Sequence, residues 1–163
     1  MDPKRRKAIL GLFVKDPLVE YGVWGSLELS DWYYQYLSAD KKTYIMQAEI
    51  IAAIAVYYSL PDMLRGRPVV YFIDNTSALS AMIHGYTRQP DCARLVNVFH
   101  AQALRLGCEY YFEWVPSKAN IADVPTRPEL LSLLPRGSRK VNLVLPPVEQ
   151  MYGPLTDWLE TEG

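Results

Sequence analysis

The sequence has few cysteines, no long apolar run and almost no net charge, and each shortage argues against a class of protein. Its 163 residues hold two cysteines, Cys92 and Cys108, which form no Cys-x-x-Cys pair and no cluster with histidine, so a structural zinc site is not expected. The longest apolar stretch, residues 50–58, is too short to cross a bilayer. Seventeen Lys and Arg against eighteen Asp and Glu leave a net charge of −1, which argues against binding nucleic acid or anionic membrane through bulk positive charge.

The first residues of the chain resemble a signal peptide in part. The basic residues 4–7 precede an apolar stretch, but Lys15 and Asp16 follow it where small residues would define a cleavage site. Half of the chain is apolar, and twelve Tyr and four Trp argue against disorder. We therefore predict an intracellular protein, cytoplasmic or nuclear and not secreted, with buried reduced thiols and no membrane segment.

Hydrophobic periodicity predicts the element order β-β-β-α-β-α-α-β-α. The predicted strands cover residues 8–14, 21–29, 32–37, 69–73 and 109–115. The predicted helices cover residues 43–60, 76–83, 91–106 and 120–126. Strands before and after crossover helices imply an α/β (α+β) fold with a mixed sheet covered by helices. We expect one domain over residues 1–134 and a proline-containing, acidic extension or linker over residues 135–163.

Four carboxylates interrupt apolar surroundings. Asp16 follows the first strand, Glu49 lies within an apolar helix, Asp74 ends an apolar strand, and Asp123 lies just beyond the last strand. Each has an ordinary interpretation as well. Asp16 suits a turn before Pro17, Glu49 suits the polar side of its helix, Asp74 suits a helix cap, and Asp123 suits an exposed helical position.

Taken together, the four acids indicate a metal site. Ligand sites form at the ends of buried strands in mixed sheets. Several carboxylates that converge there repel one another unless a divalent cation neutralises them, and hard oxygen ligands select Mg²⁺ or Mn²⁺. Two such ions held by acids are suited to phosphodiester cleavage.

Three segments carry a family resemblance: Gln47-Ala48-Glu49, residues 72–79 (Phe-Ile-Asp-Asn-Thr-Ser-Ala-Leu) and residues 114–127 (Trp-Val-Pro-Ser-Lys-Ala-Asn-Ile-Ala-Asp-Val-Pro-Thr-Arg). Over about residues 8–130 the chain resembles the ribonuclease H domain of retroelement reverse transcriptases of the DIRS, LTR-retrotransposon and hepadnavirus-like kinds. The resemblance implies a ribonuclease H-like fold: a five-stranded mixed sheet whose first three strands are antiparallel, with helices on both faces.

The resemblance also implies an activity. Asp16, Glu49, Asp74 and Asp123 would hold two Mg²⁺ ions, with Mn²⁺ as a substitute, and hydrolyse the RNA strand of RNA–DNA hybrids. Its partners would be the hybrid and the reverse transcriptase domain of the same polyprotein. The candidate substrate-binding residues comprise two family positions for backbone contact, an asparagine that orders the loop before Asp123, and three basic residues: Asn75, Ser77, Asn120, Arg88, Lys118 and Arg127.

Two departures from the family pattern keep other functions open. Asp16-Pro17-Leu18 replaces the usual Asp-Ala-Ser, and no histidine lies between the last strand and Asp123, because His84 and His100 lie elsewhere. These departures motivate the alternative of a catalytically inactive ribonuclease H-like connection or scaffold module that binds nucleic acid or the polymerase. A DNA-acting nuclease or integrase is a third possibility, which the 120–127 motif argues against. For the basic residues Arg88, Lys118 and Arg127, the alternative interpretation is an ordinary solvated charge that contacts no substrate.

Overall fold

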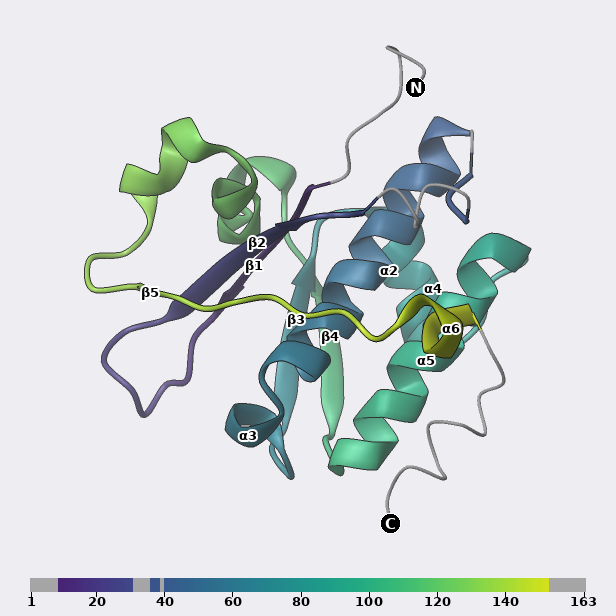
Figure 1. Ribbon diagram of the computed structural model, residues 1–163, viewed down its shortest axis with the longest axis horizontal. Helices are drawn as coiled ribbons and strands as arrows, with labels where there is room; N and C mark the ends of the chain where they lie inside the picture. Colours follow the sequence, from purple (N-terminus) through teal and green to yellow (C-terminus); the bar gives the residue numbers. More distant parts are fainter. Residues whose placement is uncertain (1–8, 31–35, 39, 153–163) are drawn as a thin grey trace.

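The protein is built from two small sheets and a helical layer in a computed structural model that describes residues 9–30, 36–38 and 40–152 (Figure 1). Its strands are β1 (Ile9–Val14), β2 (Val23–Glu28), β3 (Val69–Ile73), β4 (Tyr110–Trp114) and β5 (Arg139–Lys140). Its α-helices are α2 (Lys41–Ser59), α3 (Pro61–Leu64), α4 (Thr76–His84), α5 (Pro90–Leu106) and α6 (Val148–Tyr152). Three 3₁₀ helices follow β4: η1 (Ser117–Ala119), η2 (Ile121–Thr126) and η3 (Pro128–Leu133).

The described strands form two separate sheets. In the first, β1 pairs antiparallel with β2, from Ile9 opposite Glu28 to Val14 opposite Val23, and β2 pairs in parallel with β5. In the second, β3 and β4 pair in parallel over their full lengths. The strand order is therefore β1-β2-β5 in one sheet and β3-β4 in the other.

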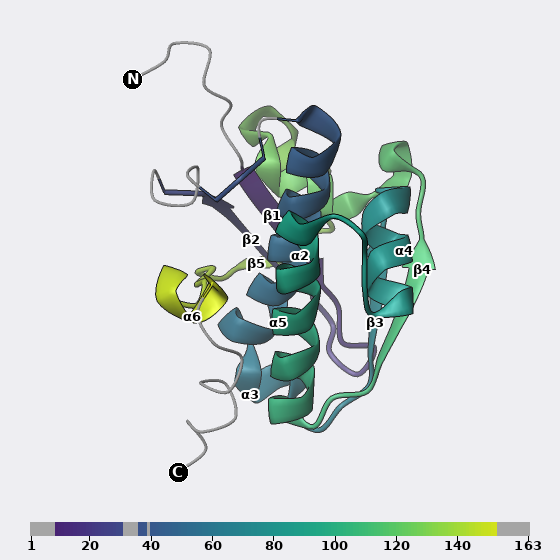
Figure 2. The same cartoon turned by 90° about the vertical axis from the view of Figure 1, so that its right-hand side faces the viewer.

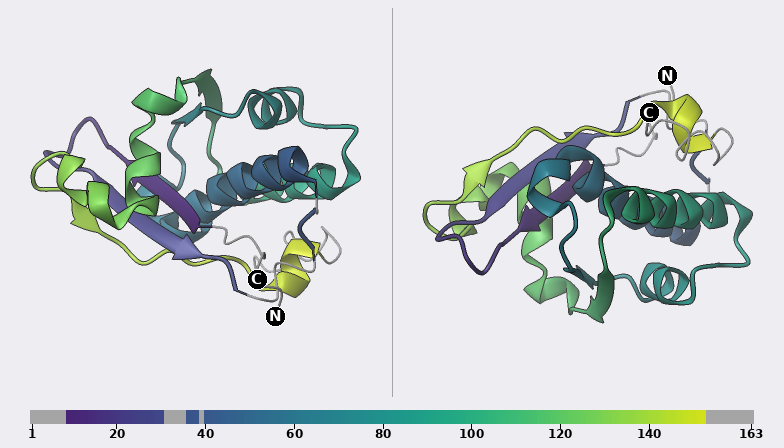
Figure 3. Two further views of the ribbon diagram at one scale, coloured as in Figure 1. Left: turned by 90° about the horizontal axis from the view of Figure 1, so that it is seen from above. Right: turned by 90° about the horizontal axis from the view of Figure 1, so that it is seen from below.

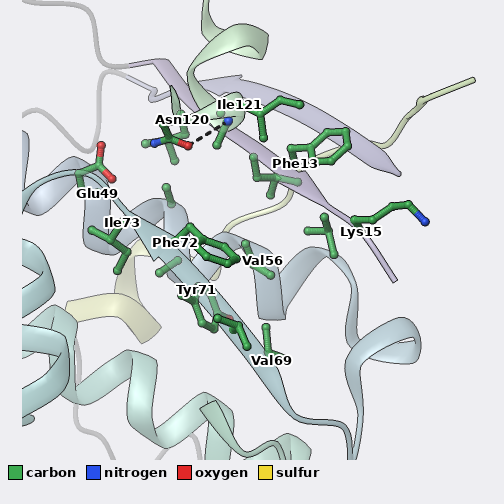
Figure 4. Close-up of a pocket in the computed structure, with 18 of the residues that line it drawn as sticks. Phe13, Lys15, Glu49, Val56, Val69, Tyr71, Phe72, Ile73, Asn120 and Ile121 are labelled. Carbon is green, nitrogen blue, oxygen red and sulfur yellow. Dashed lines mark hydrogen bonds between the residues drawn. The ribbon is translucent and has the colours of Figure 1, made fainter. Parts of the chain in front are cut away.

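The expectation of a five-stranded sheet with three antiparallel first strands is wrong, although the α+β class agrees with the structure. The sheets stay apart because β1 and β3 do not pair. Asp16, just beyond the end of β1, forms an ion pair with Arg67, just before the start of β3. Gly11, early in β1, packs against the backbone of Ala122 on the side where β3 ends. The two strands therefore run in opposite directions along a cavity that separates them (Figure 4).

The edge of β2 that the third antiparallel strand was expected to occupy holds another segment. Residues 31–35 of that predicted strand lie outside the described residues, and Tyr36–Ser38 form a turn and bend. The N–H of Arg139 donates to the carbonyl of Gly22 at 2.9 Å, and that of Val141 donates to Trp24 at 2.8 Å. A segment from the far end of the chain thus completes the sheet.

Helix α2 forms the centre of the core. Its side chains are apolar on nearly every face, and Ile50, Ile51, Ile54 and Tyr57 are at most 1% exposed. The helix begins after Asp40, whose carboxylate accepts a bond from the Thr43 N–H at 3.0 Å. It packs beside α5 (Figure 2) and also contacts β1. The backbone of α2 therefore holds Glu49 rigidly between the two sheets.

Residues 139–152 cross the domain from the first sheet to α6, as the yellow-green segment in Figures 1 and 3 shows. Leu143 packs on Gly25, and the Ser59 hydroxyl both donates to the carbonyl and accepts from the N–H of Val144, at 3.1 and 2.8 Å. Met151 is fully buried, and its carbonyl accepts a bond from Arg94 Nε at 3.0 Å. This part of the expected extension is packed onto the domain, whereas the boundary at residue 134 stays a prediction.

No helix in the described part of the chain is both long enough and apolar enough to span a membrane.

Candidate functional site

A cavity of about 650 Å³ lies between β1 and β3, with α2 along it (Figure 4). Its lining is mainly apolar, but the two ends differ. Glu49, Asn120 and Asp123 lie toward the end of β3, whereas Lys15, Asp16 and Arg67 lie toward its start. The cavity thus has an acidic end and a basic end.

Three of the four predicted metal ligands influence one another at the acidic end. Glu49 is on α2, Asp74 follows β3, and Asp123 is in η2. The negative charges of Asp74 and Asp123 both act on Glu49, and that of Asp74 acts on Asp123. We call Glu49, Asp74 and Asp123 the acid triad.

Asn120 ties two members of the acid triad together. Its side-chain oxygen accepts from the Ala122 N–H at 3.1 Å and so caps η2, the helix that carries Asp123. Its side-chain nitrogen donates to the Asp74 carboxylate at 3.1 Å. The predicted role of Asn120 in ordering this loop agrees with both bonds.

Burial sets the protonation of Glu49. Removal of this carboxyl from water raises its pKa to about 7, and the charges of Asp74 and Asp123 add to the shift. Burial, followed by the charge of Asp74, also raises the pKa of Asp123, while Arg127 opposes that increase. The Glu49 carboxyl therefore binds or releases a proton near neutral pH, and the positive charge of Arg127 acts on Asp123.

Asp16 lies at the other end of the cavity. Its carboxylate is 2.7 Å from the Arg67 guanidinium and accepts the Leu18 N–H at 2.9 Å, which makes it the turn residue of the ordinary interpretation. The bond from Arg67 and then that from Leu18 lower the pKa of Asp16 to about 2. The structure thus places three of the four predicted ligands within electrostatic reach of one another and pairs the fourth with an arginine.

The predicted substrate-binding residues fall into two groups. Lys118, Asn120 and Arg127 belong to the segment that carries Asp123, and Lys118 and Arg127 are exposed. Ser77 and Arg88, also exposed, line a second cavity of about 630 Å³ between the start of α2 and α4. Asn75 has a structural role, because its side-chain oxygen accepts from the Ala78 N–H at 2.8 Å and so caps α4.

Sequence reasoning missed several residues at these two cavities. Arg67 belongs to a turn whose partner depends on the long-range fold, so no local signal marks it. Gln47 of the motif is not among the residues that line these cavities. It serves the fold, because its buried side chain accepts from the Ser38 N–H at 2.7 Å and donates to the Tyr36 carbonyl at 3.1 Å. The second cavity adds residues from two segments that are distant in sequence: Asp40, Thr43, Met46, Thr76, Ser80, His84 and Thr87.

The oxygen ligands of the acid triad are suited to a divalent cation, but the distances between its side chains are not. Carboxylate oxygens are the donors that Mg²⁺ prefers, and a cation would relieve the repulsion that raises the pKa of Glu49. Within the described ranges, however, no three Asp, Glu, His or Cys side chains lie close enough to form a ready ligand group. Binding of a cation therefore requires these side chains to approach one another.

None of the family models, curated proteins or solved structures compared with the chain matches it. The chemistry of the site therefore follows from its own residues.

Proposed function

We propose that the protein is a divalent-cation-dependent endonuclease that hydrolyses the RNA strand of RNA–DNA hybrids, as part of a retroelement reverse transcriptase polyprotein. The observation that carries the proposal is the acid triad at the end of β3, supplied by the three motifs that resemble ribonuclease H. Asp16 is left outside the site, because Arg67 holds it at the other end of the cavity.

Glu49, Asp74 and Asp123 would hold the cation, which supplies charge neutralisation and activation of water. In the reaction, the oxygen of water bonds to phosphorus, the bond to the ribose 3′ oxygen breaks, and that oxygen leaves with a proton. Asn120 holds the Asp74 carboxylate in place through the 3.1 Å bond from its side-chain amide. Without the cation the pKa of Glu49 is about 7, so binding of the cation to this carboxylate would release a proton near neutral pH.

Exposed polar side chains on both sides of the acid triad supply contacts for a backbone. Lys118 and Arg127 lie on the segment with Asp123, and Ser77 and Arg88 line the second cavity. Recognition of a hybrid depends on phosphates and on the RNA 2′-hydroxyls, which hydroxyl and cationic side chains bind without reading sequence. A net charge of −1 leaves the binding weak, so affinity would come from the neighbouring polymerase domain.

The test is cleavage of an end-labelled RNA–DNA hybrid in Mg²⁺. We expect Asp74→Asn to abolish cleavage while circular dichroism shows an intact fold. The matched control is Asp62→Asn, because Asp62 is exposed on α3 and lies outside the acid triad. Full cleavage by folded Asp74→Asn would overturn the proposal.

A second candidate is a catalytically inactive module that binds nucleic acid or the polymerase. The position of Asp16 favours it, because three carboxylates without the fourth leave the predicted two-ion ligand set incomplete. Titration with Mg²⁺ and Mn²⁺ separates the two candidates. The absence of both thermal stabilisation by the cations and cleavage, together with retained hybrid binding, would favour the inactive module.

A further inference from the structure

The cavity between β1 and β3 is bounded by two strand edges that no described strand occupies. We propose that this cavity binds an extended segment of another polypeptide. The segment would have apolar side chains at alternate positions, a Lys or Arg at the end beside Glu49, and an acidic residue at the end beside Lys15. This binding is separate from the proposed nuclease activity and does not depend on it.

The edge of β3 that faces the cavity offers unused backbone groups. The Val69 N–H donates at 2.9 Å toward β4, and the Ile73 carbonyl accepts at 3.1 Å from the residue that follows β4. Because backbone groups alternate along a strand, those of Val70 and Phe72 point away from β4. Among the described strands, β4 is the one partner of β3. An added strand can therefore bond to Val70 and Phe72.

The edge of β1 offers the same opportunity from the opposite side. Within the described part of the chain β1 pairs with β2 alone, and all of its residues line the cavity on their way to Lys15. Since β1 and β3 run in opposite directions, an inserted strand is antiparallel to one and parallel to the other. Both arrangements are ordinary in mixed sheets, so a single strand can pair with both edges.

The walls of the cavity suit apolar side chains. Ala48, Ala52 and Val56 of α2 lie along it, and their small size leaves room for larger groups. Phe72 and Val70, which line the cavity, are 61% and 50% exposed, far more than the core residues of the same strand. Figure 4 shows the side chains of Phe72, Val56 and Phe13, which line the cavity from β3, α2 and β1. Exposed aromatic surface beside unpaired strand edges favours strand addition.

The charges at the two ends select the occupant. Glu49 and Asp123 line one end of the cavity, and Asp74 adds its charge there. Lys15, Asp16 and Arg67 line the other end, where Arg67 pairs with Asp16 and the Lys15 ammonium group donates to backbone carbonyls, so this end keeps a net positive charge. A segment with a basic residue at one end and an acidic residue at the other therefore complements the cavity along its length.

The test is fluorescence anisotropy in EDTA with two labelled seven-residue probes, Lys-Val-Thr-Val-Thr-Val-Glu and the reverse sequence. We expect at least one probe to bind. N-methylation of alternate amides should weaken its binding about tenfold or more, since each lost backbone bond contributes about 1 kcal/mol. A probe with glutamate at both ends should also bind more weakly. Cleavage of hybrid is not measured, so failure here is distinct from failure of the proposed function.

Two variants test whether the peptide binds in the cavity. Ala52→Trp should fill it and abolish binding, whereas Leu104→Trp, on an exposed position of α5, should leave binding unchanged. Should Ala52→Trp fail to fold, Val70→Pro removes one cavity-facing N–H without touching the bonds to β4. The proposal is overturned if neither probe binds, if the N-methylated probes bind equally well, or if the cavity is instead filled by a second copy of the chain, detected as self-association in sedimentation.

Discussion

The carboxylate of Asp16 and the guanidinium of Arg67 lie 2.7 Å apart and join the end of β1 to the turn before β3. The pair connects the two strands at the end of the cavity away from the acid triad. A residue that the motif pattern places among the metal ligands thus has a structural partner of its own.

Removal of Arg67 should raise the pKa of Asp16 toward its ordinary value. In Arg67→Ala we expect the Asp16 carboxyl to titrate closer to 3.8 than to about 2, followed by NMR of the side-chain carbonyl. Since folding lowers this pKa, the pair stabilises the fold above pH 3.8 and loses its contribution as the pH falls from 3.8 toward 2. Arg65→Ala, a neighbouring exposed arginine, is the control. An unchanged titration in Arg67→Ala would contradict the pairing.

Glu49 should make the protein less stable as the pH rises. Its pKa increases from 4.5 to about 7 on folding, so the folded state keeps a proton that the unfolded state has released in that interval. The free energy of unfolding should therefore fall by about 3 kcal/mol between pH 4.5 and 7. Glu49→Gln should remove this decrease, measured by urea denaturation across the range. Glu109→Gln, on an exposed position, should retain it. A decrease that persists in Glu49→Gln would assign it to another group.

Asn120 should show two separable roles. Asn120→Ala loses both the cap of η2 and the bond to Asp74, at a cost of about 1 to 2 kcal/mol by thermal denaturation. Asn120→Asp keeps the capping oxygen but places a carboxylate beside that of Asp74. We expect Asn120→Asp to be the less stable variant at pH 7 and to recover in acid, where protonation removes the repulsion. Equal stability of the two variants at both pH values would show that Asp74 is not in contact with this side chain.

Leu143 should be essential to the first sheet although it lies late in the chain. It is 9% exposed and packs on Gly25 of β2, so Leu143→Ala should cost about 2 to 3 kcal/mol in urea denaturation. Val144→Ala is the matched control, since its side chain is 50% exposed and its bonds to Ser59 involve the backbone. Similar losses from both substitutions would argue against specific packing of Leu143 on Gly25.

Local patterns predicted most individual elements well. The apolar run at 69–73 is β3, and the helices expected at 43–60, 76–83 and 91–106 are α2, α4 and α5 within two residues at each end. Apolar period, helix-breaking Pro and Gly, and caps are local signals, and Gly107 ends α5 in the left-handed conformation that favours glycine.

Pairing between elements could not be read in the same way. Residues 139–140 carry no sequence pattern typical of a strand. They form one because they pair with the exposed edge of β2 and because Leu143 packs on Gly25. The contact between Asp16 and Arg67, which are 51 residues apart, likewise has no local signal. Asp16 was expected among the metal ligands because it follows the first strand, and its pairing with Arg67 could be found only from the arrangement in space.

The segment that crosses from the first sheet to α6 also affects how the chain folds as it is made. Ser59 and Val144, which exchange two hydrogen bonds, are separated by 85 residues. Such distant contacts slow folding, because a long loop must close before they form. During synthesis, β2 keeps its edge open and Gly25 uncovered until residues 139–145 leave the ribosome. The N-terminal sheet is therefore completed only when the last residues of the described part of the chain are made, and its open β2 edge can mispair until then.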